Sequence, residues 1–413
     1  MAISSRPFLL PSPLWGGVQR DRALLYAARG LRGLGDGFAI IVLPAYLSAL
    51  GLTTVEIGIV VSASLLGTAM LTLSVGLIAP RHDLRTLLLT GAALTAATGL
   101  AFPNVAQFIP IAIVAFIGTI NPHTGDLGVL VPLEHAMLAR GAADEERTRV
   151  FARYSLIGAL SMAAGSLAAA LPDILVRSGV GNITALKLMF YVYAALGLAA
   201  FLLYRRLPHA QADAPRAAAA LGPSRGIVYR LAALFSLDAF AGGFVVQSLL
   251  ALWLFERFDM TLSGASLFFF WASTLSAFSY PVAAWLAKRI GLVNTMVFTH
   301  IPSSVFLILA AFAPNLPFAL VCLSLRAALS QMDVPTRTSY VMAVVTPEER
   351  PAAASMTAVP RSLASSVSPA LTGVLLATPF SGLPLIACGV LKIVYDLALL
   401  TSFRHTRPPE EEV

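Results

Sequence analysis

Twelve apolar runs in two groups of six constrain this chain more than any other feature. Each run approaches or exceeds the roughly 20 residues that a helix needs to cross the hydrocarbon core of a bilayer. The pattern predicts an all-α polytopic membrane protein whose twelve transmembrane helices form two pseudo-symmetric six-helix bundles. The runs lie at residues 23–50, 57–79, 86–102, 108–139, 150–171, 185–204, 227–255, 263–287, 292–312, 318–345, 352–377 and 383–403.

The composition excludes several classes of soluble protein. Hydrophobic residues make up 57% of the 413 residues and charged residues only 12%, whereas a soluble globular domain carries about 25% charged residues. The mean hydropathy of +0.80 leaves more apolar surface than a soluble fold of this size can bury. We therefore exclude a soluble enzyme, a disordered chain and a nucleic-acid-binding domain.

The two groups of apolar runs define the expected domains. Residues 1–22 are expected to be a cytoplasmic segment, and residues 23–204 an N-terminal six-helix bundle. Residues 205–226 are rich in Ala and Pro and carry charge, which is typical of a flexible linker. A C-terminal six-helix bundle at 227–403 and a cytoplasmic tail at 404–413 complete the predicted organisation.

The positions of Lys and Arg predict the orientation in the membrane. With the N-terminus inside, the expected inside segments hold 18 of the 28 Lys and Arg residues, and the outside loops hold only Arg177, Lys187 and Arg257. Positive residues concentrate on the cytoplasmic side of membrane proteins. We expect both termini in the cytoplasm, and a multi-pass protein of a bacterial cytoplasmic (inner) membrane. This asymmetry also explains the net charge of +7 without a nucleic-acid partner.

The two halves of the chain repeat one another at an offset of about 203 residues. Single matches are weak, but their order and nearly constant offset together indicate a duplication. Duplicated halves are typical of carriers in which two similar bundles move around a central site near the bilayer midplane. Three pairs of acidic residues keep this offset: Asp36 with Asp238, Asp126 with Asp333, and Glu146 with Glu349.

The segment between the second and third runs contains a characteristic loop. Residues 76–85 read GLIAPRHDLR, which is similar to the G-x-L-A-D-R-x-G-R loop of the major facilitator superfamily. The chain resembles that family across residues 20–404. The resemblance implies a secondary transporter in which this loop and its second-half copy form charge pairs that hold one conformation. The residues at the matching positions are Gly76, Arg81, Asp83, Arg85, Lys288 and Arg289.

The loop departs from the family pattern at two positions. Pro80 stands where the family has an aspartate, and Asp83 stands where it has a glycine. The usual charge pair of this loop is therefore altered. We expect Asp83 to pair locally with Arg81 or Arg85.

Three charged residues share one stripe of the first expected helix. Arg29, Arg32 and Asp36 are spaced by three and four residues, which places them on one face. A charge at the bilayer centre costs at least about 2.5–3.5 kcal/mol on insertion scales, so it needs a partner or a wet cavity. Asp36 is either a proton-carrying or substrate-binding carboxylate, or an internal ion-pair partner of Arg32 or Arg29.

The fourth run contains a polar segment around Asn121, Pro122, His123, Gly125 and Asp126. Proline and glycine at this density predict a kink or an unwound stretch, whose freed backbone groups must face protein or water. The segment either binds substrate and shares a proton between His123 and Asp126, or it is a structural kink. We expect no metal site here.

The second half carries its own intramembrane charges. Asp238 in the seventh run is the counterpart of Asp36, and Gln247 follows it. In the tenth run, Arg326, Asp333 and Arg337 follow one helical stripe that Pro335 is expected to bend. Asp333 can pair with Arg337 one turn away.

Three further expectations concern the C-terminal half. Arg361 lies among small polar residues suited to close helix packing. Lys392 and Asp396 are four residues apart, and we expect them to neutralise one another. Several aromatic side chains are expected to face lipid or its interface: Trp253, Phe268, Phe269, Phe270 and Trp271.

These patterns predict a secondary active transporter, with proton-coupled export of a small organic compound as the preferred activity. Transport of an organic anion is the alternative, because several arginines lie at membrane depth. A channel or a membrane-embedded enzyme fits less well, since the nucleophile and metal motifs of such enzymes are missing. We expect a monomer in contact with lipid, a proton as coupling ion, no cofactor and no nucleic acid. The binding or coupling candidates are Asp36, Asp126, His123, Asn121, Asp238, Gln247, Asp333, Arg32, Arg326 and Arg361.

Overall fold

The computed structural model describes residues 13–122, 128–140, 144–210, 221–346 and 349–403. Over these ranges the chain is helical and forms no β-strand. The N-terminal half contains α1 (Pro13–Ala49), α2 (Thr54–Ile78), α3 (Leu84–Ala101), α4 (Phe108–Ile117), α5 (Leu130–Arg140), α6 (Asp144–Ala168), α7 (Leu171–Arg177) and α8 (Asn182–Tyr204). The C-terminal half contains α9 (Arg225–Gly243), α10 (Gln247–Phe258), α11 (Leu262–Ile290), α12 (Leu292–Ala311), α13 (Leu316–Ser330), α14 (Asp333–Ala343), α15 (Arg350–Leu376) and α16 (Leu383–Phe403).

Polar side chains fix where several of these helices begin. Thr53 and Glu56 form a reciprocal capping box at the start of α2, in which the Thr53 amide donates to Glu56 Oε2 at 2.8 Å. The carboxylate of Asp83 accepts the Thr86 amide at 3.0 Å at the start of α3. Such caps satisfy amides that a first helical turn leaves without partners. The short sequence between two apolar runs therefore sets the boundary of each helix.

Nine helical segments in the described ranges are long and apolar enough to cross a bilayer. We number the predicted membrane spans 1 to 12 in chain order. Span 4 (residues 108–139) and span 10 (residues 318–345) are each divided into two shorter helices, α4 with α5 and α13 with α14. The break in span 4 confirms the prediction from its proline and glycine content. In span 10 the break falls at 331–332, so that Pro335 lies in the first turn of α14, where a missing amide hydrogen breaks no helical bond.

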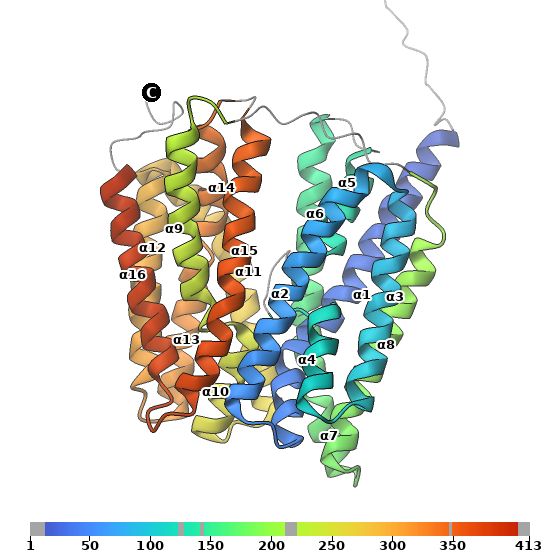
Figure 1. Cartoon of the computed structure of the whole chain (residues 1–413), viewed down its shortest axis with the longest axis vertical. Coiled ribbons are helices and arrows are strands. Elements are labelled where there is room, and N and C mark those ends of the chain that lie inside the picture. Colours follow the sequence, from blue (N-terminus) through green and yellow to red (C-terminus); the bar gives the residue numbers. More distant parts are fainter. Residues whose placement is uncertain (1–12, 123–127, 141–143, 211–220, 347–348, 404–413) are drawn as a thin grey trace, which may run out of the picture.

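The two halves form two bundles that lie side by side, with α1–α8 in one and α9–α16 in the other (Figure 1). This arrangement confirms the predicted fold of two pseudo-symmetric helical halves. The first described turn of α1 and the last turn of α16 lie at the same end of the molecule, at the top of Figure 1. We call this end the terminal face and the opposite end the distal face.

Helices α2 and α15 seal the two halves together near the distal face. Gly58 of α2 lies so close to α15 that a Cβ atom on it would be 2.5 Å from the carbonyl oxygen of Pro369, and Gly373 packs equally closely on the backbone of Thr54. The Ser62 hydroxyl accepts the Ala370 amide at 2.8 Å in the same contact. Small residues allow such close backbone approach between membrane helices.

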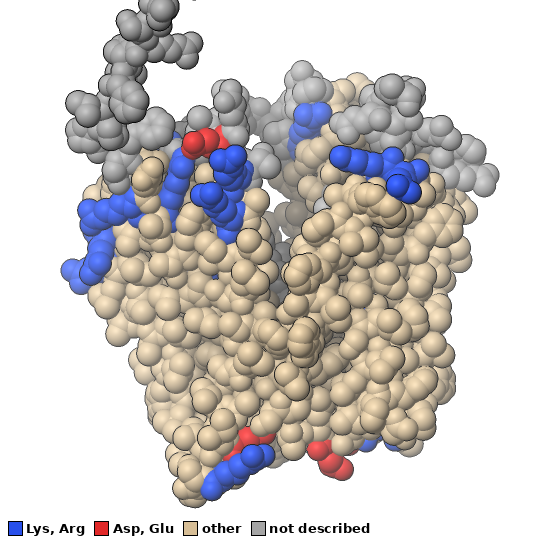
Figure 2. Space-filling model, turned by 180° about the vertical axis from the view of Figure 1, so that it is seen from behind, with Lys and Arg blue, Asp and Glu red and all other residues tan. Residues whose placement is uncertain are grey.

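The terminal face is more open. Figure 2 shows a cleft between the two halves at this face, with Lys and Arg gathered around it. The described contacts between the halves therefore concentrate towards the distal face, and the space between the bundles widens towards the terminal face.

Candidate functional site

In the N-terminal half, Arg32 forms an ion pair with Glu134 of α5. The carboxylate of Glu134 is fully buried, with 0% of the residue exposed, and it also accepts the hydroxyls of Tyr154 and, at 2.6 Å, of Tyr204. The local pairing of Arg32 with Asp36 that the sequence allowed is not formed. Arg32 pairs with Glu134 instead of Asp36 because α1 packs near α5. Residue spacing along α1 alone does not reveal this partner.

Asp36 forms no ion pair within the described part of the chain. Its side chain lies beside Tyr193 of α8. Asp36, Asn121, Tyr193 and Arg29 line a small cavity inside the N-terminal half. The structure therefore brings together three of the predicted candidates, Arg32, Asp36 and Asn121, at the wall of a polar cavity.

The break in span 4 ends α4 at Ile117, and α5 begins at Leu130. His123 and Asp126 lie outside the described residues, so their predicted role stays a prediction. Pro122, at the near side of the break, offers its carbonyl oxygen to the other half. The Ser248 hydroxyl donates to this oxygen at 3.1 Å and the Ser248 amide at 3.5 Å.

Span 7 is also interrupted, which the sequence did not predict. Helix α9 ends at Gly243 and α10 begins at Gln247, with the residues between them outside both helices. The broken spans 4 and 7 therefore meet through the contact of Ser248 with Pro122. Gln247, a predicted candidate, begins α10 and lines two cavities that adjoin one another.

We call the first of these the central cavity. It lies between α6 of the N-terminal half and α11 and α13 of the C-terminal half. Arg29 and Arg326 line it, and none of its lining residues is acidic. The second, the C-terminal cavity, shares Gln247 and Arg326 with the first and extends among α9, α12, α14, α15 and α16.

Asp238 is the centre of the charges around the C-terminal cavity. It is 4% exposed. One carboxylate oxygen, Oδ1, accepts Lys392 Nζ at 2.6 Å, and the other, Oδ2, accepts Arg337 Nη1 at 3.1 Å. Arg337 also pairs with Asp333 at 3.1 Å, as its spacing on the helix predicted. The counterpart of Asp36 is therefore held by two cations, whereas Asp36 forms no ion pair with any residue that the structure describes.

Lys392 and Asp396 do not neutralise one another as expected. Lys392 binds Asp238 of α9. Asp396 Oδ1 instead lies 3.0 Å from Nδ1 of His300 on α12. Lys392 Nζ also lies 3.2 Å from His300 Nε2. Spacing along α16 allowed the local pair, but α9 and α12 pack against α16 and supply closer partners.

Arg326 and Arg361 differ from Arg337 and Lys392, the other cations around the C-terminal cavity. Both line the C-terminal cavity. Within the described residues, the ion pairs of this half involve Asp238, Asp333 and Asp396, and none of them reaches Arg326 or Arg361. The Nε atom of Arg361 is buried and has no hydrogen-bond partner there. Two guanidinium groups therefore face the cavity without a neutralising carboxylate.

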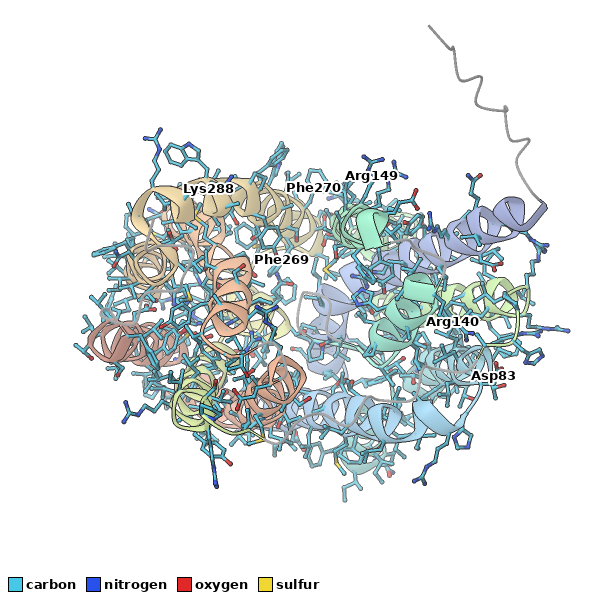
Figure 3. The ribbon with its side chains drawn as sticks, turned by 90° about the horizontal axis from the view of Figure 1, so that it is seen from above. Asp83, Arg140, Arg149, Phe269, Phe270 and Lys288 are labelled. Atoms are coloured by element: carbon cyan, nitrogen blue, oxygen red, sulfur yellow. The ribbon has the colours of Figure 1, made fainter. Side chains whose placement is uncertain are left out.

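Phe268 and Phe269 form an apolar wall of the central cavity, which corrects the expectation that they face lipid. They are 7% and 3% exposed. Figure 3 shows Phe269 on the side of α11 that faces the space between the two halves. Trp253 is also buried, at 1% exposed, whereas Trp271 is exposed as expected. A stretch of adjacent aromatic residues faces all sides of a helix, so its composition did not reveal which of them turn inward.

The loop that carries the family resemblance lies at the terminal face. Gly76 and Arg81 are exposed, as are Lys288 and Arg289 of the second half. Asp83 lies at the outer rim of one half and Lys288 at the rim of the other (Figure 3). Arg289 lies over the ring of Trp285 at 4.3 Å. In the described residues no ion pair links the two loops.

Asp83 fastens the linker rather than pairing with Arg81 or Arg85 as expected. Its carboxylate accepts the Ala210 amide at 2.6 Å and lies 3.0 Å from His209 Nδ1. Arg85 in turn contacts His209 Nε2 at 2.9 Å. Burial raises the pKa of Asp83, but hydrogen bonds from the Ala210 amide and from Thr86 outweigh it, and the pKa falls below its ordinary value.

Glu146 and Glu349 correspond to one another in the sequence repeat. Each binds a residue near the start of the first helix of its own half. Glu146 Oε2 accepts Arg22 Nη2 at 3.1 Å. Glu349 accepts the Gly222 amide and the Thr346 hydroxyl, the latter at 2.9 Å. A hydrogen bond from Ser224 and these contacts lower the pKa of Glu349 below its ordinary value, although burial opposes them.

Sequence reasoning missed three groups at this site. His300 stands alone in an apolar run and gave no periodic signal. Lys392 was assigned to a local pair, and Phe268 and Phe269 were assigned to lipid. The remaining candidates were placed at a cavity wall or an ion pair, apart from His123 and Asp126, which lie outside the described residues.

Comparison with known proteins agrees with this architecture. A model of the Major Facilitator Superfamily matches residues 25–254 and 231–413. An uncharacterized membrane protein of Saccharomyces cerevisiae is 25% identical, and the match covers 94% of each chain.

Two solved transporters share the fold. The nucleoside transporter NupG is 15% identical with a TM-score of 0.73, and the match covers 94% of this chain and 100% of NupG. A D-xylose-proton symporter is 16% identical with a TM-score of 0.72, covering 95% of this chain and 98% of the symporter. At these identities the structural likeness concerns the fold alone. The family match spans both halves, and the chain therefore belongs to the major facilitator superfamily, with the fold of a multi-pass membrane transporter.

Proposed function

We propose that this protein is a secondary active transporter that moves a small organic anion by alternating access, with a proton as the coupling ion. The observation that carries the proposal is the pair of guanidinium groups, Arg326 and Arg361, that face the C-terminal cavity without a carboxylate partner in the described residues. The sequence analysis gave an organic anion as the alternative substrate, and these two arginines favour it over a small organic compound of unspecified charge.

The contrast with neighbouring cations supports this choice. Arg32, Arg337 and Lys392 all contact carboxylates. A buried charge without a partner is costly and is kept in membrane helices chiefly where it serves a pathway or a ligand. A guanidinium group matches a carboxylate or phosphate with two parallel hydrogen bonds. An anion at Arg326 and Arg361 supplies the missing partner.

The cavity walls indicate an organic rather than an inorganic anion. Arg326 lines the central cavity opposite apolar residues that include Phe268 and Phe269. Ligand sites of this kind combine apolar walls with a few polar groups that fix orientation. Gln247 and Ser330 line both cavities and offer neutral hydrogen-bonding groups beside the arginine.

Asp36 remains the proposed proton-carrying carboxylate of the N-terminal half. It lines a cavity and has no ion-pair partner in the described residues, which leaves it able to change its protonation state without breaking an ion pair. Asp36→Asn should abolish accumulation driven by a proton gradient while the protein stays in the membrane. The preference for export is a prediction that oriented vesicles test, with the terminal face proposed as cytoplasmic from its positive charge.

The test uses purified protein in liposomes that enclose a pH-sensitive dye, so that proton movement coupled to a solute is followed against protein-free liposomes. Benzoate, lactate and succinate serve as anion probes, tetraethylammonium as a cation probe and xylose as a neutral probe. We expect at least one anion to drive protein-dependent proton movement. Arg326→Gln or Arg361→Gln should weaken the apparent affinity for that anion about 100-fold, since a charge-assisted pair contributes about 1.5–3 kcal/mol.

Controls separate binding from folding. Arg326→Lys keeps the charge but loses the two-pronged geometry, so it should bind more weakly than the parent and more tightly than Arg326→Gln. Arg177→Gln removes an exposed arginine outside both cavities and should leave the proton movement unchanged. Proton movement only with tetraethylammonium or xylose, or with none of the anions, contradicts the proposed substrate class.

A further inference from the structure

His300 lies within a path of ionisable side chains that runs from the C-terminal cavity to Asp396. Lys392 Nζ lies 2.6 Å from Asp238 Oδ1 and 3.2 Å from His300 Nε2. His300 Nδ1 lies 3.0 Å from Asp396 Oδ1. Asp238, Lys392 and His300 line the cavity, although His300 is only 3% exposed, and Asp396 lies behind them with 0% exposed. The four side chains come from α9, α12 and α16 and form one continuous path.

The partners of His300 assign its proton. A carboxylate only accepts hydrogen bonds, so Nδ1 carries a proton and donates it to Asp396. The ammonium group of Lys392 only donates, so Nε2 presents its lone pair to Lys392. His300 is therefore neutral in this structure, and Lys392 occupies the one position at which a second proton can be added.

A second proton on His300 changes these contacts. An imidazolium N–H and an ammonium group 3.2 Å apart repel one another and have no hydrogen bond to share. His300 Nε2 is already 4.0 Å from Asp238 Oδ1, the oxygen that now holds Lys392. Protonated His300 is therefore placed to take over this carboxylate oxygen when Lys392 leaves it.

The other groups around this path favour the exchange. Asp238 Oδ2 stays paired with Arg337, which is also held by Asp333, so Asp238 does not move away with Lys392. Tyr395 packs edge-on against the His300 ring, with centroids 6.1 Å apart. Across the cavity, Arg326 and Arg361 carry the charges described above, and an anion bound to them attracts the released ammonium group.

We propose that His300 is a proton-carrying group of the C-terminal half, and that its protonation releases Lys392 from Asp238 into the cavity as a further binding group for the anion. The proposal rests on the proposed function for the nature of the substrate. It adds to that function a link between protonation of His300 and binding of the anion. Because coupling between two ligands is reciprocal, a proton that strengthens anion binding is itself held more tightly when the anion is bound.

The N-terminal half contains a different cluster of charges. There Glu134 is held by Arg32 and two tyrosine hydroxyls. An arginine does not lose its proton in proteins, so Arg32 stays charged. In the C-terminal half, His300 adds a side chain that can both gain and lose a proton.

The test needs no substrate. Protein carrying ¹⁵N-histidine and ¹³C-lysine is placed in phosphatidylcholine–phosphatidylglycerol vesicles and studied by solid-state NMR between about pH 5 and about pH 9. The chain has six histidines, and its lysines are only Lys187, Lys288 and Lys392, so few signals arise. Spectra of His300→Asn and Lys392→Arg assign them. If either variant fails to fold, single variants of the other histidines and lysines assign the signals by elimination: His82, His123, His135, His209, His405, Lys187 and Lys288.

We expect His300 Nε2 to gain a proton as the pH falls, and the dipolar contact between Lys392 Cε and His300 Nε2 to disappear over the same pH range. Two results overturn the proposal: the contact persists after Nε2 is protonated, or Nε2 takes up no proton in this range.

A second measurement links the switch to the anion. Benzoate should bind the parent about tenfold more tightly at pH 6 than at pH 8, within the usual range of coupling between two sites. His300→Asn keeps a donor towards Asp396 but adds no proton at the Nε2 position, so this pH dependence should vanish. An unchanged pH dependence in His300→Asn overturns the role of His300. Absence of benzoate binding counts against the proposed substrate class, whereas the NMR result still decides the switch.

Discussion

Glu146 and Glu349, which the repeat of the chain places 203 residues apart, perform matching tasks at the terminal face. Glu146 holds Arg22, in the first part of α1, and Glu349 holds Gly222, just before α9. In each half, the acidic residue that follows the fourth helix of the bundle therefore anchors the chain that enters the first. The two halves share this contact, and its partner is a side chain in one half and a backbone amide in the other.

Glu349→Gln should loosen the end of the linker. The lowered pKa of Glu349 shows that its charged form is favoured by the Ser224, Gly222 and Thr346 contacts, and a neutral amide accepts these bonds more weakly. Hydrogen exchange at Gly222 and Ser224 should become faster above about pH 5, where the parent carboxylate is charged. Glu146→Gln is the matched control and should leave exchange at these two amides unchanged. Equal exchange in Glu349→Gln and the parent contradicts the anchoring role.

Asp83→Ala should lower the free energy of unfolding by about 1 kcal/mol, the usual loss for removal of a helix cap. The pKa of Asp83 is lowered from 3.8, so its charge stabilises the protein fully above that pH and less as the pH falls through the folded value. The difference from the parent should therefore be present at pH 7 and narrow below about pH 4.

Asp83→Asn serves as the comparison because asparagine also caps helices well. It keeps an acceptor for the Thr86 amide but has one oxygen fewer for Ala210. Its stability should lie between those of the parent and Asp83→Ala. Chemical unfolding in detergent at several pH values measures all three. A pH-independent gap between the parent and Asp83→Ala refutes the charge argument.

Glu134→Gln should be strongly destabilising, by about 3–5 kcal/mol, because it leaves Arg32 charged and without its carboxylate in a buried site. Replacing both partners, with Arg32→Met and Glu134→Leu together, removes the unpaired charge and should recover much of the loss. Unfolding of the single and double variants measures the difference. Additive losses in the double variant count against a buried ion pair.

Gly373→Ala should shift the protein towards a conformation that is open at the distal face. The added methyl group meets the backbone of Thr54 and Val55, and overpacking of this kind costs about 1–3 kcal/mol in the closed contact. Spin labels at positions 178 and 314, both exposed and in different halves, should report longer distances. Gly226→Ala is the control because a Cβ atom there meets nothing within 4 Å. Matching distance distributions for the two variants would refute the seal.

Much of this architecture followed from the sequence because a bilayer imposes strong rules. The apolar runs and the break at Pro122 are local patterns with direct physical consequences. The pairing of Asp333 with Arg337 was also predictable, because both lie one turn apart on α14.

The partners of the other charges were not predictable in this way. Lys392 binds Asp238, which is 154 residues away, in preference to Asp396 on its own helix. The sequence of α16 alone does not show which carboxylate Lys392 binds. The packing of α9, α12 and α16 decides it. Phe268 and Phe269 illustrate the same limit, since hydrophobic side chains suit lipid and cavity walls alike.

The contact between Ser248 and Pro122 affects the free energy needed to separate the two halves. Each residue lies at a break, where its own span does not complete the helical hydrogen bonds, and each supplies the group that the other half lacks. When the halves part at this level, a carbonyl oxygen and a hydroxyl lose their bond, and an unsatisfied buried polar group costs about 1–3 kcal/mol. A solute that offers both a donor and an acceptor replaces this bond, and it therefore lowers the cost of parting the halves at this level.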